Sequence, residues 1–327
     1  MLFGKNKPPY TTPHASQAPG GEGRNTATDR MLASAVQEYV QEQRLRRRWG
    51  IFFKLVLFLF IGGAIIAQFT EDETMVGGEH TAMVEINGII GPNDLSADNI
   101  NQSIRDAFSA ESSVGVILRI NSPGGTPVQA AQINEEITRL KVLYPDKPVY
   151  AAVTDVCASG GYYIAVAADE IFAHPSSIVG SIGVLMNGFG FVGAMEKLGV
   201  ERRLIIAGEN KALLDPFSPV TRAQKHHAQT MIDEVHQQFI NAVRSGRGDR
   251  LSSNESEIFS GLLWSGETAL ALGLVDRFGS AQLIAREILG AEMLVDYSYR
   301  PTFMEQFADR IGTTLSSMLL DRSIRLQ

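Results

Sequence analysis

The sequence has 327 residues, enough for one large domain or two small ones. Hydrophobic residues make up 44% and charged residues 20%, which is ordinary for a folded globular protein. The formal net charge of -7, without a basic patch interleaved with aromatic residues, argues against nucleic acid as a partner. The single cysteine, Cys157, excludes an internal disulfide and a cysteine-based zinc site. Because the histidines also lack ligand spacing, we expect no metal and no cofactor.

The N-terminal region is expected to hold a membrane anchor. Residues 1–30 are rich in Pro, Gly, Thr and Ser and are predicted to be disordered. Residues 31–48 resemble a short polar helix that ends in a cluster of arginines. The apolar segment 49–69 would span roughly 31 Å as a helix, enough to cross the hydrocarbon of a bilayer. A signal peptide would begin nearer the start, and a buried helix would not lie between basic and acidic stretches. We therefore predict one transmembrane helix.

The charge around this segment predicts its orientation. Residues 1–48 carry eight Lys or Arg, whereas Glu71, Asp72 and Glu73 follow the span. The positive-inside rule then places the N-terminus in the cytoplasm and residues 70–327 outside it. In a bacterium this is a single-pass protein of the inner (cell) membrane, with its main domain in the periplasm or on the outer face.

Beyond the anchor, strand-like and helix-like segments alternate. The residue pattern predicts strands at 81–88, 114–120, 148–156, 171–174 and 200–208, with helices at 127–143, after Ser159, and from Ser218-Pro219 to Gly246. Such alternation is typical of an α/β fold in which helices cover a parallel sheet. We expect this domain to span 80–290.

Residues 291–327 form a predicted C-terminal amphipathic extension. From Arg300 onward the apolar residues recur at four-residue spacing, which is typical of an amphipathic helix. We expect this helix to pack on its own domain or on a neighbour. The apolar residues concerned are Phe303, Phe307, Ile311, Leu315 and Leu319.

Three segments punctuated by glycine carry the candidate chemistry. In RINSPGGT (119–126), a turn after a strand can aim free backbone N–H groups at a substrate carbonyl. In VTDVCASGGYYIAVAAD (153–169), Ser159 lies at an elbow between a strand and a helix, either as a nucleophile or as a helix N-cap. In the third segment (200–219), Lys211 follows a strand-like run, and a solvated surface lysine is the default interpretation.

Serine needs a base, and the residues alone leave its identity open. His174 with Asp155 or Asp169 could form a Ser–His–Asp arrangement, but nothing in the sequence ties His174 to Ser159. Cys157 could itself be a nucleophile, but its place two residues before the elbow indicates that it points inward.

The ordered set RINSPGG, ASGGYYIA, SSIVGSIGV and AGENKALLDPFSP resembles the SppA-type signal peptide peptidases over residues 80–280. The resemblance implies a ClpP/crotonase-like fold of stacked ββα units. It also implies Ser159 as nucleophile, Lys211 as general base, and Ser181 as the residue that orients the lysine amine. The oxyanion hole would be formed by N–H groups of Gly124 or Gly125 together with Gly160.

The single copy of the domain resembles the short form of this family. Short forms assemble into a ring-shaped homo-oligomer whose active sites face an enclosed interior. The resemblance further implies peptide substrates, namely the remnants of cleaved signal peptides.

A lysine can act as a base only when it is neutral. A free lysine has a pKa near 10.4, and bringing it to about 7 to 8 requires burial away from any carboxylate. We therefore expect Asp215 to point away from Lys211, toward the helix that follows.

Two other functions remain open from the sequence. A crotonase-like acyl-CoA enzyme would use the glycine N–H groups for an enolate, although an exported domain fits poorly with cytoplasmic coenzyme A. In a non-catalytic membrane scaffold the glycine-rich segments would only permit close packing.

Overall fold

The computed structural model describes residue 31 and residues 47–63, 78–92 and 95–300. The chain divides into two units, residues 1–75 and 76–327. In the first unit, residues 47–63 form a helix whose large apolar side chains are exposed. No helix within the described ranges is both long and apolar enough to cross a membrane. Residues 64–69 of the predicted span, the predicted tail 1–30, most of 31–48 and the predicted C-terminal helix beyond Arg300 lie outside the described residues.

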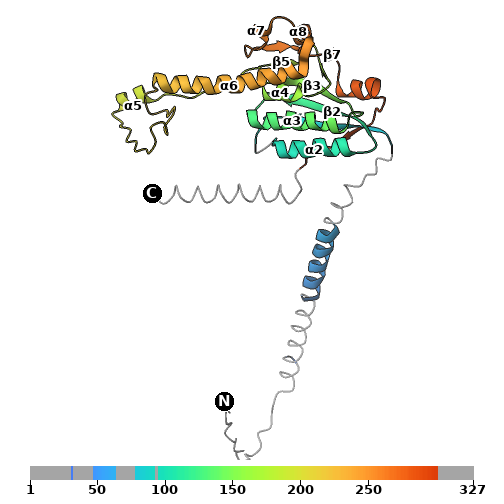
Figure 1. The fold of residues 1–327 in the computed structure, drawn as a ribbon. Coiled ribbons are helices and arrows are strands. Elements are labelled where there is room, and N and C mark those ends of the chain that lie inside the picture. Colours follow the sequence, from blue (N-terminus) through green and yellow to red (C-terminus); the bar gives the residue numbers. More distant parts are fainter. Residues whose placement is uncertain (1–30, 32–46, 64–77, 93–94, 301–327) are drawn as a thin grey trace, which may run out of the picture. The chain divides into compact units, whose positions relative to one another are not determined.

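The second unit is built on one sheet in the order β6-β5-β3-β2-β1-β8 (Figure 1). β4 pairs with the first half of β3, whose second half pairs with β5. All pairs are parallel except β5 with β6. This mixed α/β sheet with strand–helix units fits the predicted ClpP-like fold. The strands are β1 (His80–Asn87), β2 (Ser113–Ser122), β3 (Val149–Ala158), β4 (Glu170–Ala173), β5 (Ile178–Gly180), β6 (Leu263–Ser265), β7 (Arg277–Phe278) and β8 (Leu294–Asp296).

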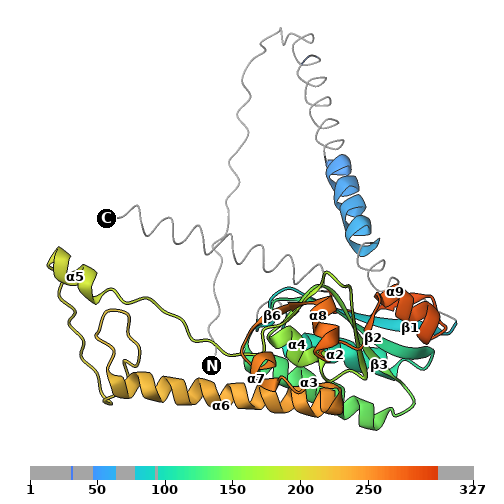
Figure 2. The same cartoon turned by 90° about the horizontal axis from the view of Figure 1, so that it is seen from above.

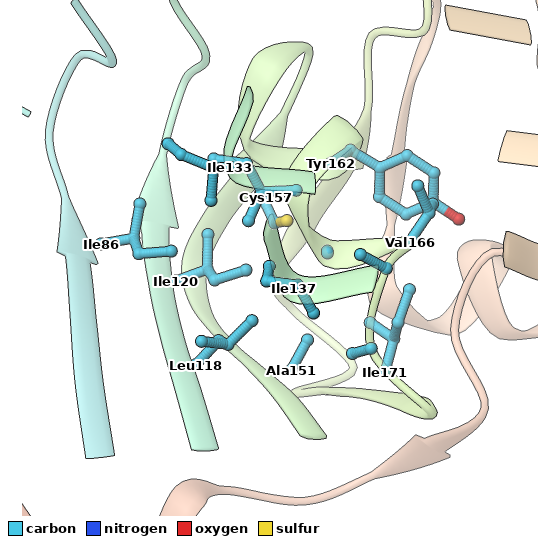
Figure 3. Packing of buried hydrophobic residues seen from close by; sticks show 14 of the residues in the cluster. Ile86, Leu118, Ile120, Ile133, Ile137, Ala151, Cys157, Tyr162, Val166 and Ile171 are labelled. Atoms are coloured by element: carbon cyan, nitrogen blue, oxygen red, sulfur yellow. The ribbon is translucent and has the colours of Figure 1, made fainter. Parts of the chain in front are cut away.

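One face of the sheet is covered by α2 (Ala97–Ser109), α3 (Pro127–Leu143) and α4 (Gly160–Ala165). Pro127 starts α3, as its fixed φ favours the first helical turn, which confirms the prediction of a helix over 127–143. Ile133 and Ile137 lie one turn apart on α3 and pack on Leu118 and Ile120 of β2 (Figure 3).

The opposite face is covered in part by α9 (Ala281–Leu283) and the following η2 (Ile284–Ile288). The chain then returns to the sheet, where β8 pairs with β1. β8 lies beyond residue 290, the predicted end of the domain, and extends the sheet by pairing with the edge strand β1. Three short helical segments complete this part of the chain: η1 (Gly248–Arg250), α7 (Glu255–Ile258) and α8 (Gly266–Ala271).

Between β5 and β6 the chain leaves the sheet and forms α5 (Val192–Leu198) and the long α6 (Arg222–Arg247). We call residues 185–221 the arm. The predicted strand at 200–208 is wrong: residues 201–206 have no regular structure, since no described strand lies beside them to accept their hydrogen bonds.

The predicted limits of the long helix were also wrong. It begins at Arg222 rather than at Pro219, because Thr221 and Gln224 form a reciprocal capping box. It also continues through Gly246, where a Cβ would lie 2.0 Å from the Val166 carbonyl oxygen. Gly246 thus allows α6 to lie close against the end of α4 instead of ending the helix.

The turns that follow β2 and β3 are in direct contact. The parallel register pairs Ser122 with Cys157, so both strands end at the same edge. Gly124 has a φ of +109°, and a Cβ there would lie 2.6 Å from the Ser159 Cβ and 2.8 Å from the Gly160 nitrogen. Only glycine therefore lets the first turn lie this close to Ser159.

A buried ion pair attaches the C-terminal end of α6 to the sheet. The Arg247 guanidinium is 2% exposed and donates to both Asp276 carboxylate oxygens, at 2.7 and 2.8 Å, and to the Gly273 carbonyl at 2.8 Å. The backbone N–H of Ile171 donates to the same carboxylate at 2.7 Å. Burial opposes ionisation of Asp276, but these hydrogen bonds hold its pKa below the usual range. The ion pair thus connects the C-terminal end of α6 to β4 through Asp276.

We expect Arg247→Met to lower the free energy of unfolding by about 3 kcal/mol, because the Asp276 carboxylate loses both hydrogen bonds from the buried guanidinium and keeps the more exposed Arg250 as its ion-pair partner. Urea denaturation measures the loss. Arg244→Met, on the same helix but in an exposed pair with Glu255, is the control and should cost no more than about 1 kcal/mol. Equal losses in the two variants would contradict the anchoring role of Arg247.

We expect Gly124→Ala to destabilise the fold more than Gly88→Ala. Both glycines have a large positive φ, +109° and +117°, so each substitution carries a backbone strain of about 1–3 kcal/mol. At Gly88 the nearest atom to a Cβ is a leucine methyl at 3.8 Å, so only Gly124→Ala must also displace the Ser159 turn. Thermal unfolding of both variants measures the difference, and matching losses would argue against the tight contact.

Candidate functional site

Ser159 lies at a sharp elbow between β3 and α4. Its φ of +51° is uncommon for a residue with a side chain. The backbone holds this conformation, since the Ser159 N–H donates to the Gly180 carbonyl at 2.8 Å and the Ser159 carbonyl accepts from Tyr163 at 2.9 Å. Ser159 occupies the N-cap position, but its hydroxyl makes no capping hydrogen bond. The hydroxyl is therefore available for chemistry.

Two backbone N–H groups beside Ser159 are unengaged. Within the described part of the chain, neither Gly125 nor Gly160 donates its N–H to an acceptor. Gly160 is the first residue of α4. A Cβ at Gly160 would lie 3.2 Å from the Gly125 nitrogen, so the two glycines are close neighbours. The N–H of Gly124, in contrast, donates to the Ser122 hydroxyl at 3.1 Å. Of the three predicted glycines, Gly125 and Gly160 are the two whose N–H groups can donate a hydrogen bond to a substrate oxygen.

Ser181 follows β5 directly. Because β3 and β5 are parallel and Ala158 pairs with Gly180, Ser159 and Ser181 emerge from neighbouring strand ends. Ser181 also has a positive φ, +53°, and its N–H donates to the Leu262 carbonyl at 2.7 Å. The structure thus brings Ser181 together with Ser159 and the glycine turns.

A cavity of about 220 Å³ opens beside Ser159. Its apolar walls, which come from three helices and from the segment after Ser181, could not be identified from the sequence. The sequence spacing of Val128, Ala131, Gln132 and Glu135 places them on one face of α3. It does not show that this face lines a cavity, because that depends on α3 beginning beside Ser159. The largely apolar side chains are Pro127, Val128, Ala130 and Ala131 of α3, Tyr163 of α4, Val184 in the segment after β5, and Val235 and Phe239 of α6.

The structure does not bring Lys211 to Ser159 within one chain. Lys211 is exposed, lies in the arm and is not among the residues that line the cavity. The 26 residues of α6 extend over about 39 Å, and Val235, which lines the cavity, lies about 20 Å from the first residue of α6. Figure 2 shows α5 at the end of α6 that is remote from the sheet.

Contacts within the arm engage Asp215. Its carboxylate accepts a hydrogen bond from the Ser218 hydroxyl at 2.7 Å and pairs with Arg202 at 3.4 Å. The Arg202 guanidinium lies over the Phe217 ring, 5.6 Å from its centre. The hydrogen bond from Ser218, with the charge of Arg202, holds the pKa of Asp215 below its usual range. Asp215 is thus directed to Ser218 and Arg202.

The alternative bases and nucleophile lie elsewhere. His174 and Asp155 line a separate cavity with Arg119 and Phe278. Asp169 accepts from the Val149 N–H at 2.8 Å and pairs with a lysine of α3. Cys157 is fully buried in the core, as predicted, and burial raises the pKa of its thiol (Figure 3). Neither a Ser–His–Asp arrangement nor a cysteine nucleophile fits this geometry.

Comparison with known proteins gives consistent results. Residues 142–291, which include Ser159, Ser181 and Lys211, match the model of peptidase family S49. Over 243 residues the chain is 33% identical to a protein of Methanocaldococcus jannaschii named as a protease, covering 70% of this chain and 76% of that protein. Over 227 residues it is 30% identical to an Enterococcus faecium protein named as the signal peptide peptidase SppA, covering 66% and 65%.

A further relative has a different name. Over 187 residues the chain is 45% identical to a Brucella abortus protein named Na(+)/H(+) antiporter NhaA, covering 57% of this chain and 25% of that protein. The chain thus spans only a quarter of that relative's length. The family model, the relative covered over three quarters of its length and the ordered glycine segments agree on one conclusion: the chain belongs to peptidase family S49, the family of the SppA-type peptidases.

Proposed function

We propose that the protein is a serine endopeptidase in which Ser159 attacks the scissile peptide bond. The observation that carries this proposal is the elbow itself: a hydroxyl without a capping bond lies beside two unengaged glycine N–H groups and an apolar cavity. A nucleophile, an oxyanion site and a side-chain pocket are the parts that acyl transfer to serine needs.

The chemistry divides into two halves. A neutral lysine amine takes the Ser159 proton while the hydroxyl oxygen bonds to the carbonyl carbon. The carbonyl electron pair moves to its oxygen, which the N–H groups of Gly125 and Gly160 stabilise. The oxyanion then collapses, the C–N bond breaks, and the protonated lysine gives its proton to the leaving amine. In the second half, water attacks the acyl-enzyme by the same route and releases the carboxylate and Ser159.

The base is Lys211 of a neighbouring subunit. Lys211 lies on the arm, remote from the Ser159 of its own chain, so a second copy must supply it. The arm also exposes apolar side chains that a monomer would leave in water, including Phe189 at 82% and Ile205 at 97%. A ring-shaped homo-oligomer fits a contact in which the arm of each subunit reaches the next. Ser181, beside Ser159, is placed to orient the incoming amine.

The substrates are proposed to be short exported or membrane peptides, above all the remnants of cleaved signal peptides. This proposal combines the family with the apolar segment 49–69, which would anchor the protein in the bacterial inner membrane. The N-terminus would lie in the cytoplasm and the peptidase domain outside it, where such remnants arise.

Subunit mixing tests the divided site. We expect Ser159→Ala and Lys211→Ala each to lower the hydrolysis of a signal-peptide-like substrate at least about a hundredfold, without loss of fold. An equimolar mixed ring should regain about a quarter of the activity, because an intact Ser159 then meets an intact Lys211 in about one contact in four.

The control is Ser159→Ala mixed with the double variant Ser159→Ala/Lys211→Ala, which should remain inactive. Folded mixed rings without recovered activity would exclude a site shared between subunits. Near-normal activity of Lys211→Ala alone would end the proposal of a lysine base.

Arg202 should protect the lysine from Asp215. We expect Arg202→Met to lower kcat at neutral pH by about fivefold, because the Asp215 carboxylate, which keeps its hydrogen bond from Ser218 but loses its cationic partner, can pair with the Lys211 ammonium and keep it charged. Adding Asp215→Asn should restore kcat. Steady-state kinetics of the single and double variants measure this, and a double variant as impaired as Arg202→Met would show that Arg202 acts only through packing.

A further inference from the structure

The cavity beside Ser159 has one charged residue in its lining. Apolar side chains form most of its walls, and the Tyr163 and Phe239 rings are in contact, with centres 4.9 Å apart. The neutral polar groups are the amides of Gln132 and Gln238 and the hydroxyls of Ser159 and Tyr163, and Glu135 is the one carboxylate. Glu135 is itself exposed to solvent, so its carboxylate lies where the cavity opens, and a lone carboxylate there favours a cation over an anionic group.

The position of Glu135 along α3 sets its distance from the Ser159 end of the cavity. Val128, Ala131 and Glu135 share one face of the helix, and Glu135 lies about 10 Å beyond Val128 along the helix axis. Side chains on a helix tilt toward its N-terminus, which favours an approach of the Glu135 carboxylate to the Ser159 end of the cavity.

The Glu135 carboxylate is free to bind a ligand. Among the described residues it takes part in no hydrogen bond or ion pair, whereas the adjacent Glu136 is paired with Arg105 and Arg139. Its charge reaches the cavity, because burial and then the charge of Glu135 raise the pKa of the Tyr163 hydroxyl.

The position of the cavity identifies which substrate side chain it receives. Ser159 and the N–H groups of Gly125 and Gly160 belong to its lining, so the residue whose carbonyl is attacked lies at its mouth. The side chain of that residue, on the acyl side of the scissile bond, is the one that can enter.

Given the proposed peptidase function, on which this inference rests, we propose that the cavity selects lysine or arginine on the acyl side of the scissile bond. The aliphatic stem of such a side chain packs against Val128, Ala131 and Phe239, and its cationic end pairs with Glu135. Glu135 is therefore a specificity-determining residue.

The test uses the full chain and three peptides that differ only in the acyl-side residue: lysine, norleucine and glutamate. Norleucine has the same stem as lysine but lacks the ammonium group. We expect the wild-type protein to favour lysine over norleucine in kcat/KM by about twofold to fivefold, and Glu135→Gln to remove that preference. Glu135→Lys should favour the glutamate peptide instead.

Glu111→Gln is the matched control, since Glu111 is exposed in the turn after α2 and does not line the cavity. It should keep the wild-type ratio between lysine and norleucine peptides. Cleavage of the norleucine peptide without a lysine preference, or a preference that survives Glu135→Gln, would overturn the role of Glu135 alone. If the wild-type protein cleaves none of the peptides, the peptidase function itself fails.

Discussion

The close approach of two turns determines the rest of the site. The loop after β2 can lie against the elbow after β3 only because Gly124 has no side chain to separate them. This contact aligns the Gly125 and Gly160 N–H groups with Ser159, and the parallel register of β2, β3 and β5 brings Ser181 to the same edge. The carboxyl ends of parallel strands are a common location for sites in α/β proteins, because loops from several strands converge there.

The remaining parts of the site depend on α6. Its C-terminal end is held to the sheet by Arg247 and Asp276, and its middle supplies Val235 and Phe239 to the cavity beside Ser159. The arm, which carries Lys211, lies beyond its N-terminal end. One helix thus joins a firmly packed core to an arm whose large apolar side chains, such as Phe189 and Ile205, are left exposed by the described part of the chain. The proposed nucleophile and the proposed base therefore lie on separate structural elements.

Those parts of the fold whose structure depends on neighbouring residues in the sequence could be predicted from the sequence. Pro127 and the spacing of Ile133 and Ile137 predicted α3 to the residue, and the small residues after β3 predicted the elbow at Ser159.

The predicted start of α6 is wrong because the capping box of Thr221 and Gln224 prevails over the Ser-Pro signal. The strand at β8 and the cavity walls could not be predicted, because they depend on distant partners. The β-branched and apolar residues within 200–208 favour a strand, but composition does not reveal whether a neighbouring strand exists to pair with it.

The burial of Cys157 has a consequence for where the protein can work. The sulfur is enclosed in the core two residues before Ser159, and burial disfavours its thiolate. Thiol–disulfide exchange and oxidation to sulfenic acid both proceed through an accessible thiolate. The one thiol of this chain is therefore shielded from oxidants, and the fold tolerates an oxidising compartment without a disulfide and without a reductant.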